Sequence, residues 1–259
     1  MAILKSEAEI KVMAEGGRIL AEILEILKKE TRAGITTNHL DELSLKLIKE
    51  SGAKPAFLNY HAPGSPRSYP KTLCASLNEV VVHGVPSERI IQEGDLVKID
   101  LGLVYQNFYL DSARTVYVGK PPKEIQKLIA ITEEALALGI KIAHIGKTLG
   151  DIGHAISNCV TQNGFSIVGS LTGHGIGRNL HEDPTVFNFG RPGQGEELKE
   201  GMVIAIEPMV SASKGKIAKV KEMPDGGFAT ADGSFTAHFE HTVAITSKGP
   251  QILTRIWYN

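Results

Sequence analysis

The stretch VKIDLGLVYQNFYLDSARTV, residues 97–116, places two aspartates inside runs of apolar residues. A two-residue turn at Tyr105-Gln106 predicts a β-hairpin whose directly opposed residues have position numbers that sum to 211, and Asp100 and Asp111 satisfy that sum. The prediction therefore places their Cβ atoms about 4.5–5.5 Å apart on one face. Carboxylates that close must share a proton or bind cations. The alternative, one exposed charge and a misassigned hairpin, stays open from this stretch alone.

Two further acids interrupt apolar, strand-like segments. Glu207 lies within MVIAIEPMV and Glu240 within FTAHFEHTVAI. One such acid is usual on an edge strand, but four carboxylates together with a histidine between glycines, His174, suit divalent ions such as Mn, Fe(II), Co or Zn. Five side chains are too many for one catalytic zinc with three protein ligands, and they suit two bridged metals.

His174 lies in TGHGIGRNLHEDP, residues 172–184, whose three glycines are also typical of a phosphate-binding loop. A dinucleotide loop opens a helix after a strand. Pro184 follows Gly177 within seven residues and leaves no room for a long helix. The glycine spacing fits neither phosphate-loop pattern. We therefore expect the glycines to let the backbone pass close to its neighbours while His174 points inward.

Apolar periodicity predicts four helices in two pairs. The first spans about 6–31, and Ser6 with Glu9 forms a capping box at its start. The others span about 37–51, from Pro121-Pro122 through Leu136, and about 148–163.

The two helix pairs are related by a shift of 112 residues. This shift predicts a duplicated architecture, and chance similarity between two helix–loop–helix units is the alternative. It lays Gly34 on Gly146, Thr36 on Thr148, Leu40 on Ile152, Leu47 on Cys159, Ile48 on Val160 and Gly52 on Gly164.

Six segments have the composition of strands and are separated by Gly, Pro, Asp and Asn clusters. Paired helices and runs of strands, without strict alternation, predict an α+β fold with a largely antiparallel sheet and one domain over residues 1–259. Residues 223–234 are expected to form a turn-rich loop or hairpin. The strand segments are 78–85, 96–118, 165–171, 202–210, 235–246 and 251–257.

The composition argues against several classes of protein. The 259 residues include 28 basic and 29 acidic side chains, so charge gives no reason to expect nucleic-acid or anionic-membrane binding. No apolar run approaches the roughly 20 residues of a membrane span, and the first residues lack a signal-peptide core. Two cysteines, Cys74 and Cys159, are too few for a disulfide framework. These features predict a globular, cytoplasmic protein.

The motifs NEVVVHG, KIDLG, LDSAR, GHGIG, LHEDP, IEP and FEHT resemble, in order and spacing, the type 1, bacterial-like methionine aminopeptidases of the peptidase M24 family. The resemblance runs from about Ile3 to Thr254. It implies the pita-bread fold, in which two pseudo-symmetric halves form a curved sheet covered by two helix pairs. Type 2 members of the family carry a large insertion in the region between His181 and Glu207. Only 26 positions separate these two residues here, so the resemblance is to type 1.

The resemblance also implies a centre with two divalent ions, drawn from Co, Mn, Fe(II), Zn or Ni. Asp111 and Glu240 would bridge both ions. Asp100 would bind one ion, and His174 with Glu207 would bind the other.

Two further histidines, His83 and His181, match the family's non-ligand histidines. The resemblance implies that Glu207 accepts a proton from the attacking water, that His181 stabilises the developing oxyanion, and that His83 lies near the scissile nitrogen. These three are the expected catalytic residues, and both histidines are also expected to contact substrate.

The methionine pocket is expected to differ from that of other members. The segment HAPGSPRS, residues 61–68, is longer than the familiar connection, and Phe228 lies near where many relatives have tryptophan. We expect these departures to change pocket shape and inhibitor selectivity but not the catalytic centre. The pocket residues implied by the resemblance are Tyr60, Tyr69, Cys74 and, where a cysteine is often found, Phe57.

The implied activity is metal-dependent removal of the N-terminal methionine from nascent proteins and peptides with a small second residue, by a monomer that meets its substrates at the ribosome. Aminopeptidase P and prolidase share the metal set and are the enzymatic alternative. They normally carry an added N-terminal domain, whereas the first helix here begins at Ser6. A binding protein of the same fold that has lost catalysis is a further alternative. Such a protein should lack some ligands, and this chain has all five.

The remaining histidines have no partnering motif, with one exception. His238 lies two residues before Glu240 and shares its strand face, so the sequence leaves open whether it supports the centre. His241 is expected to point away. Trp257 and both cysteines are expected to pack in the interior. His39, His61, His144 and His154 are expected at the surface or as ordinary core residues.

Overall fold

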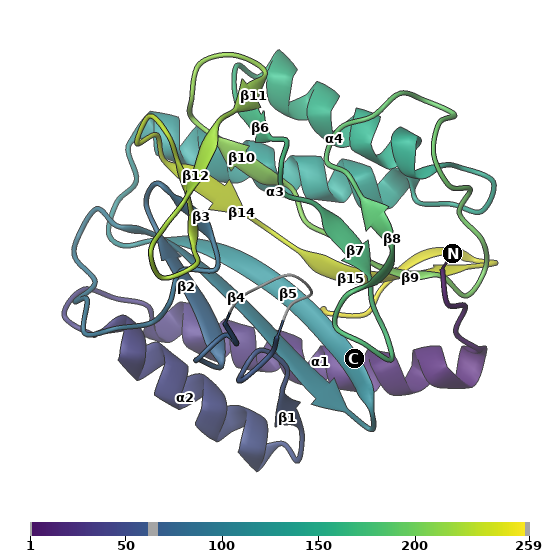
Figure 1. Ribbon diagram of the computed structural model, residues 1–259, viewed down its shortest axis with the longest axis horizontal. Coiled ribbons are helices and arrows are strands. Elements are labelled where there is room, and N and C mark those ends of the chain that lie inside the picture. Colours follow the sequence, from purple (N-terminus) through teal and green to yellow (C-terminus); the bar gives the residue numbers. More distant parts are fainter. Residues whose placement is uncertain (1, 62–66, 257–259) are drawn as a thin grey trace.

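A computed structural model describes residues 2–61 and 67–256 of the chain. Its helices form two pairs with the strands between them (Figure 1). The lower pair is α1 (Glu7–Glu30) and α2 (Thr37–Glu50), and the upper pair is α3 (Lys123–Ile142) and α4 (Leu149–Gln162). All four predicted helices are therefore confirmed, although α3 runs six residues further than predicted.

The ends of the helices follow local sequence signals. Before α1, Ser6 Oγ accepts a hydrogen bond from Glu9 N at 3.3 Å, and Glu9 Oε2 accepts one from Ser6 N at 2.8 Å. This reciprocal capping box satisfies two amides that would otherwise lack intrahelical partners. One face of α1, which includes Met13, Leu20 and Leu27, is fully buried.

The second helices of the two pairs have equivalent local structure. Helices α2 and α4 both contain 14 residues, and they follow the threonine N-caps Thr36 and Thr148. The matched glycines all adopt a left-handed backbone, in which glycine alone is unstrained. Their φ angles are 92° and 80° for Gly34 and Gly146, and 78° and 85° for Gly52 and Gly164.

Among the described residues the strands form four sheets in which every pairing is antiparallel except that of β6 with β11, so the predicted α+β class with largely antiparallel strands is confirmed. One sheet contains β1 (Lys54–Pro55), β2 (Leu73–Leu77), β4 (Leu96–Tyr105) and β5 (Phe108–Tyr117). The second has the order β11 (Ile217–Ala218), β6 (Ser166–Val168), β10 (Met209–Ser211), β14 (Thr236–His238). The third has the order β12 (Val220–Glu222), β13 (Phe228–Thr230), β3 (Val80–Val82), and the fourth β16 (Gly249–Ile252), β15 (His241–Thr246), β9 (Val203–Ile206), β7 (Gly173–Gly175), β8 (Glu182–Val186).

The predicted register of the β4–β5 hairpin is wrong. The turn residues are Gln106 and Asn107, with φ of 46° and 66°, rather than Tyr105 and Gln106. A two-residue hairpin turn of this kind needs positive φ at both positions, which asparagine tolerates well and a bulky aromatic residue does not. The strands therefore pair so that Asp100 opposes Ala113 and Asp111 opposes Gly102.

The corrected register still leaves the two aspartates on one face of the hairpin, now as diagonal neighbours. Opposite each aspartate lies a residue with a small side chain or none, Ala113 or Gly102. The aspartate side chains therefore project from the sheet without a bulky cross-strand partner.

Other strand predictions need correction as well. The predicted strands 202–210 and 235–246 are each interrupted, at Glu207-Pro208 and at Phe239-Glu240, and continue in a different sheet. Strands β1, β2, β7, β8 and β11 were not predicted, because their short segments contain glycine or proline or lack alternation. Residues 220–230 form the β12–β13 hairpin, as expected for this turn-rich region. Position 257, where the last predicted strand ends and Trp257 lies, is outside the described residues.

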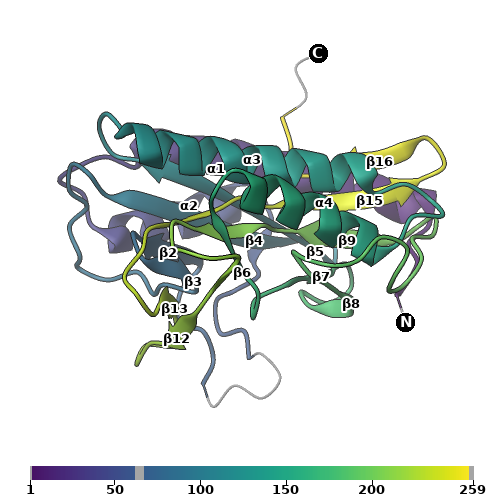
Figure 2. The same cartoon turned by 90° about the horizontal axis from the view of Figure 1, so that it is seen from above.

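Each helix pair covers its own hydrophobic core. One core includes Leu24 of α1, Leu40 of α2 and Leu101 of β4, and the other includes Leu128 of α3 and Ile156 of α4. Figure 2 shows α1 and α3 along one side of the strands, with β12 and β13 projecting from the opposite side. Within residues 2–61 and 67–256, no helix combines the length and apolar character needed to cross a membrane.

Candidate metal centre and active site

A cavity of about 340 Å³ is lined by residues from both halves of the fold. It brings together every side chain that the sequence analysis assigned to the metal centre, to catalysis or to the methionine pocket. These are Phe57, Tyr60, Tyr69, Cys74, His83, Asp100, Asp111, His174, His181, Glu207 and Glu240.

Glu207 and Glu240 lie at a bend in a two-stranded ribbon. Strands β9 and β15 pair in one sheet, and the same two chain segments continue as β10 and β14 in another. Ile206 pairs with His241 on one side of the bend, and Met209 pairs with His238 on the other. The two glutamates therefore lie between the ladders, where the ribbon changes sheets.

Strand β5 is tied to this ribbon by hydrogen bonds that fix Asp111 relative to Glu240. The Thr242 hydroxyl accepts from Asp111 N at 3.1 Å and donates to Asp111 O at 2.8 Å. Glu240 N donates to Ala113 O at 3.1 Å, and Ser112 Oγ donates to Glu240 O at 2.7 Å. These bonds fix the position of Asp111, from the first half of the chain, relative to Glu240, from the second half.

His174 reaches the same place on β7, between two glycines. A Cβ atom at Gly173 would collide with Ala205 O, and one at Gly175 with Asp183 O. This confirms that the glycines permit close backbone approach. His174 Nδ1 lies 2.8 Å from Gly175 O. Because a carbonyl only accepts, Nδ1 carries the proton and Nε2 keeps a free lone pair.

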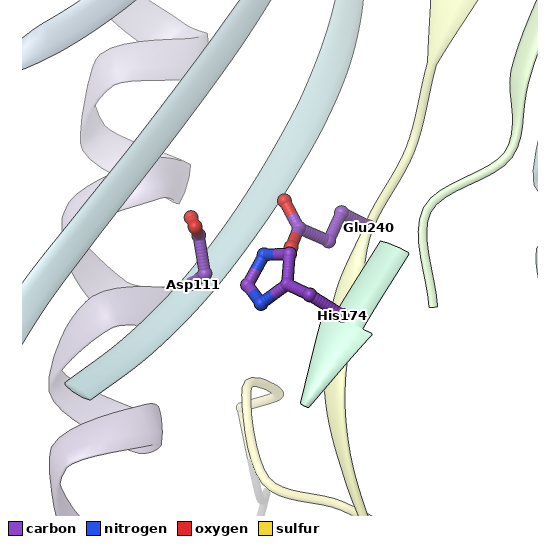
Figure 3. A group of neighbouring side chains, drawn as sticks. All are labelled: Asp111, His174 and Glu240. Atoms are coloured by element: carbon purple, nitrogen blue, oxygen red, sulfur yellow. The ribbon is translucent and has the colours of Figure 1, made fainter. Parts of the chain in front are cut away.

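The three side chains in Figure 3, Asp111, His174 and Glu240, point toward one another from different strands and loops. One ligand atom from each lies within 4.8 Å of the other two. Burial and repulsion by His181 lower the pKa of His174 to about 3, so its imidazole is neutral. A neutral imidazole whose other nitrogen is hydrogen-bonded is the form that coordinates metals.

The buried carboxylates of the cluster lack enough hydrogen-bond donors to offset their loss of solvent. Asp100, Asp111 and Glu240 are 8%, 5% and 2% exposed, and each has one oxygen with no hydrogen-bond partner among the described residues. Burial raises the pKa of Asp100 to about 6 and that of Glu207 to about 8. Burial and neighbouring carboxylates raise the pKa of Asp111 and of Glu240 well above their usual values. Divalent cations would satisfy these oxygens and remove the repulsion, so the residues fit a metal centre.

His181 lies beside the cluster and contacts Tyr60. Its ring centroid is 4.4 Å from that of His174, in an edge-on arrangement, and its Nδ1 is 2.7 Å from Tyr60 Oη. With the hydroxyl as donor, the His181 proton lies on Nε2. The ring can then donate a hydrogen bond to a carbonyl oxygen in the cavity.

The loop that carries His181 is anchored by the following residue. Glu182 Oε2 accepts from Lys5 Nζ at 2.5 Å, and Glu182 Oε1 accepts from Asn179 N at 2.9 Å. Both side chains of the Lys5–Glu182 ion pair are buried. A Cβ at Gly177 would collide with the Lys5 side chain. Glu182 thus anchors the loop, and Gly177 leaves room for the Lys5 side chain that binds it.

His83 lies on another wall of the cavity, on a left-handed backbone with φ of 58°. Its ring packs edge-on against Phe228 at a centroid distance of 5.9 Å. The side chain is exposed to the cavity, and the surrounding protein atoms with repulsion by His181 lower the pKa of His83, so this imidazole is neutral near pH 7. It can exchange hydrogen bonds with a substrate without adding charge.

The predicted pocket residues form a rigid, mainly apolar wall. Tyr69 Oη donates to Leu73 O at 2.9 Å and to Gly84 O at 3.1 Å, and its ring meets Phe57 edge-on. Cys74 lies opposite Asp100 on β2, and burial with repulsion by Asp100 raises the pKa of its thiol. The thiol is therefore neutral.

The sequence analysis did not identify part of the cavity lining. Leu180 precedes His181 in the LHEDP motif, which could have indicated it. Glu222 and Asp225 come from the β12–β13 hairpin, and only tertiary structure brings them to the cavity. Residues 62–66 of the longer connection lie outside the described residues. The additional lining residues are Arg67, Ser68, Pro70, Leu180, Glu222, Asp225 and Gly226.

The other histidines have different surroundings. His238 is 1% exposed, and its Nε2 is 3.3 Å from Glu207 Oε2. His241 does not line the cavity, and its Nδ1 is 2.8 Å from Thr254 Oγ1. His39, His61, His144 and His154 are also outside the cavity lining found among the described residues.

Nearly the whole chain is similar in sequence to known metallopeptidases. Residues 11–247 match the model of metallopeptidase family M24. The chain is 46% identical to a methionine aminopeptidase of Clostridium perfringens, over 99% of this chain and 100% of that protein. Methionine aminopeptidase 1 of Bacillus subtilis is 42% identical over 99% and 100% of the two chains.

Solved structures agree with these matches. A methionine aminopeptidase from Thermotoga maritima superimposes with a TM-score of 0.93 at 40% identity, covering 98% of this chain and 100% of that chain. The prolidase from Pyrococcus horikoshii superimposes with a TM-score of 0.75 at 28% identity, covering 100% of this chain but 65% of that chain. The predicted pita-bread fold with two pseudo-symmetric halves is confirmed, and this chain belongs to metallopeptidase family M24.

Proposed function

We propose that this chain hydrolyses the peptide bond after an N-terminal methionine in nascent proteins and peptides whose second residue is small. The observation that carries the proposal is one cavity in which a cluster of four carboxylates and His174 adjoins a mainly apolar pocket. The relatives named methionine aminopeptidase match this chain over almost its full length and support the same activity.

In this proposal the five clustered side chains hold two divalent ions. Asp111 and Glu240 would hold both ions, Asp100 would hold one, and His174 with Glu207 would hold the other. The uncompensated carboxylate oxygens and the free Nε2 of His174 support these roles. When bound, such ions supply Lewis acidity, which lowers the pKa of water and stabilises negative charge on oxygen.

The protein's own side chains complete the reaction. Glu207, which a bound cation would keep ionised, accepts the proton of the attacking water. His181 donates from Nε2 to the carbonyl oxygen, an interaction that strengthens as negative charge develops there. His83 lies near the scissile nitrogen and orients the N-terminal residue.

The pocket selects methionine by shape and polarity. Phe57 and Tyr69 meet edge-on, and the Tyr69 hydroxyl is occupied by two backbone carbonyls. Cys74 contributes a neutral thiol. These three side chains suit a long, flexible, apolar side chain.

We extend the proposal to the setting of the enzyme. Residues 1–259 act as a single catalytic domain and a cytoplasmic monomer, and its substrates are nascent N-termini at the ribosome. The ions are drawn from Co, Mn, Fe(II), Zn and Ni, because the same oxygen and imidazole ligands accept all of these.

Proline-specific cleavage is the alternative activity, since the same fold occurs in the Pyrococcus horikoshii prolidase. The 46% identity to a methionine aminopeptidase, against 28% to the prolidase, favours the methionine-specific reaction. A non-catalytic role is disfavoured because all five ligand residues and both histidines line the cavity.

A peptide series tests the proposal. We expect kcat/KM for Met-Ala, Met-Gly and Met-Ser peptides to exceed that for Met-Leu and Met-Lys by about 10²-fold or more, because even one misplaced methylene changes kcat/KM roughly 10–200-fold. A Leu-Ala peptide controls for the first residue, and an X-Pro peptide tests the prolidase alternative. Equal kcat/KM across the Met series, or preference for X-Pro, would contradict the proposal.

A further inference from the structure

His238 is a buried side chain without an assigned task. It lies at the end of β14, and neither ring nitrogen has a hydrogen-bond partner by strict geometry among the described residues. Its nearest charged neighbour is Glu207, whose Oε2 is 3.3 Å from His238 Nε2. Burying an imidazole without a partner is costly, so the short approach to Glu207 requires an explanation.

The two oxygens of Glu207 face different histidines. Oε2 faces His238, whereas Oε1 is 3.7 Å from His174 Nε2. His174 belongs to the cluster with Asp111 and Glu240. A contact that holds Oε2 therefore determines that Oε1 is the oxygen presented to that cluster.

The backbone of His238 is fixed on both sides. Its N–H donates to Thr115 Oγ1 at 2.9 Å, and the same hydroxyl donates to His238 O at 2.6 Å. On the other edge, β14 pairs with β10, and His238 lies opposite Met209. The ring is attached to a segment that is held by β5 and β10 together and has little freedom to follow Glu207.

We propose that His238 is a positioning residue for Glu207. A small rotation of either side chain lets Nε2–H, 3.3 Å from Glu207 Oε2, donate to that oxygen and keep Oε1 turned toward His174, where a cation would bind. Carboxylates that bind metals are commonly oriented by a hydrogen bond to the oxygen that faces away from the ion. This inference rests on the proposed metal centre and adds a residue to it.

The competing interpretation is that His238 binds a cation directly. Ligand atoms of Glu207, His238 and Glu240 also lie within 4.8 Å of one another. The two interpretations differ in the number of imidazoles that contact metal. Positioning requires one, from His174, and direct binding requires two.

The test compares two substitutions of similar volume with Co(II) as the probe. In His238→Gln the terminal amide can donate to Glu207 Oε2, and in His238→Leu no donor remains. We expect His238→Leu to bind Co(II) about 10–100-fold more weakly than the unmodified protein and His238→Gln to stay within about 3-fold. The leucine variant should also lower kcat with little change in KM.

X-ray absorption of the Co(II)-loaded proteins then counts imidazole ligands, and calorimetry measures affinity. We expect the imidazole count to be the same in the unmodified protein and in both variants. The matched control is His241→Gln, a histidine in the same segment outside the cavity, which should leave Co(II) affinity unchanged.

Equal Co(II) affinities of the glutamine and leucine variants, whether high or low, would overturn the donor role. A second imidazole that disappears on substitution of His238 would replace it with direct metal binding. Failure of the proposed function is distinguishable, since the unmodified protein would then neither bind Co(II) tightly nor cleave Met-Ala peptides.

Discussion

The two halves of this chain have similar helix pairs but contribute to the proposed metal centre in different ways. In both, a threonine caps a 14-residue second helix between two left-handed glycines. The first half supplies Asp100 and Asp111 from a single hairpin. The second supplies His174, Glu207 and Glu240 from segments far apart in sequence.

This difference separates the features that the two helix pairs share from the positions of the proposed ligands. The caps and glycines determine local backbone geometry, so each helix pair needs them. Ligand positions depend on where strands meet. In the first half the aspartates share a local sheet, whereas in the second the glutamates lie at the bend between two sheets. The Thr242 side chain of the second half hydrogen-bonds both the N–H and the carbonyl oxygen of Asp111 in the first half.

The largest expected effect comes from Asp111, which both halves are proposed to use. Asp111→Asn replaces a bridging carboxylate with a neutral amide. We expect it to lose high-affinity metal and to reduce kcat by about 10³-fold or more, since the centre supplies several kcal/mol of transition-state stabilisation. Metal analysis of the purified variant and steady-state kinetics provide the measurement. Asp232→Asn, outside the cavity, is the control. Two tightly bound metals and ordinary turnover in Asp111→Asn would show that the carboxylate cluster is not the centre.

The next comparison lies within the second half, between His174 and His181. His174→Ala should weaken metal binding, and excess metal should restore part of the activity. His181→Ala should keep its metal and lower kcat by about 10²–10³-fold, as expected for removal of an oxyanion donor. Calorimetric metal titration of both variants, with kcat at saturating metal, separates the roles. Metal loss confined to the His181 variant would reverse them.

A smaller effect is expected across the boundary between the halves, where Tyr60 meets His181. Tyr60→Phe removes the hydroxyl 2.7 Å from His181 Nδ1 but keeps the ring. A typical net hydrogen bond contributes about 0.5–1.5 kcal/mol, so kcat should fall roughly 2–13-fold at unchanged metal content. Steady-state kinetics with a Met-Ala peptide distinguish the roles of the hydroxyl. If KM rises and kcat does not fall, the hydroxyl serves the pocket and not His181.

The smallest effects are expected at the threonine N-caps that the two helix pairs have in common. The Thr36 side chain accepts from His39 N at 3.1 Å, and that of Thr148 accepts from Asp151 N at 3.3 Å. Thr36→Ala and Thr148→Ala should each cost about 1 kcal/mol of the free energy of unfolding. Thr148→Ala should be the more costly, because the Thr148 hydroxyl also donates to Asp151 Oδ2 at 3.0 Å, and alanine cannot make this hydrogen bond. Urea denaturation measures both. A neutral result at either position would argue against equivalent caps.

Local signals account for what the sequence predicted well. Apolar periodicity located all four helices, with a capping box at the first, and the spacing of acids within apolar segments identified side chains that the fold brings to one cavity. The hairpin register was missed because turn residues were assigned without weighing their φ angles. Asn107 adopts a positive φ of 66°, as asparagine readily does.

Tertiary structure accounts for the remaining differences. The strands around Glu207 and Glu240 were predicted as continuous because sequence periodicity does not reveal a change of sheet. Strand β7 was missed because its sequence is Gly-His-Gly, and glycine is depleted in strands. Its extended form follows from close contact with Ala205 and Asp183. The contact between His238 and Glu207 likewise requires the ribbon to bend.

The central claim is that ligands from both halves hold two divalent ions between them. Anomalous diffraction at the cobalt edge, from crystals of the full chain grown with Co(II), tests it most directly. We predict two anomalous peaks, with Asp111 and Glu240 contacting both, Asp100 contacting one, and His174 with Glu207 contacting the other. A single peak, or peaks bound by residues of only one half, would contradict the account.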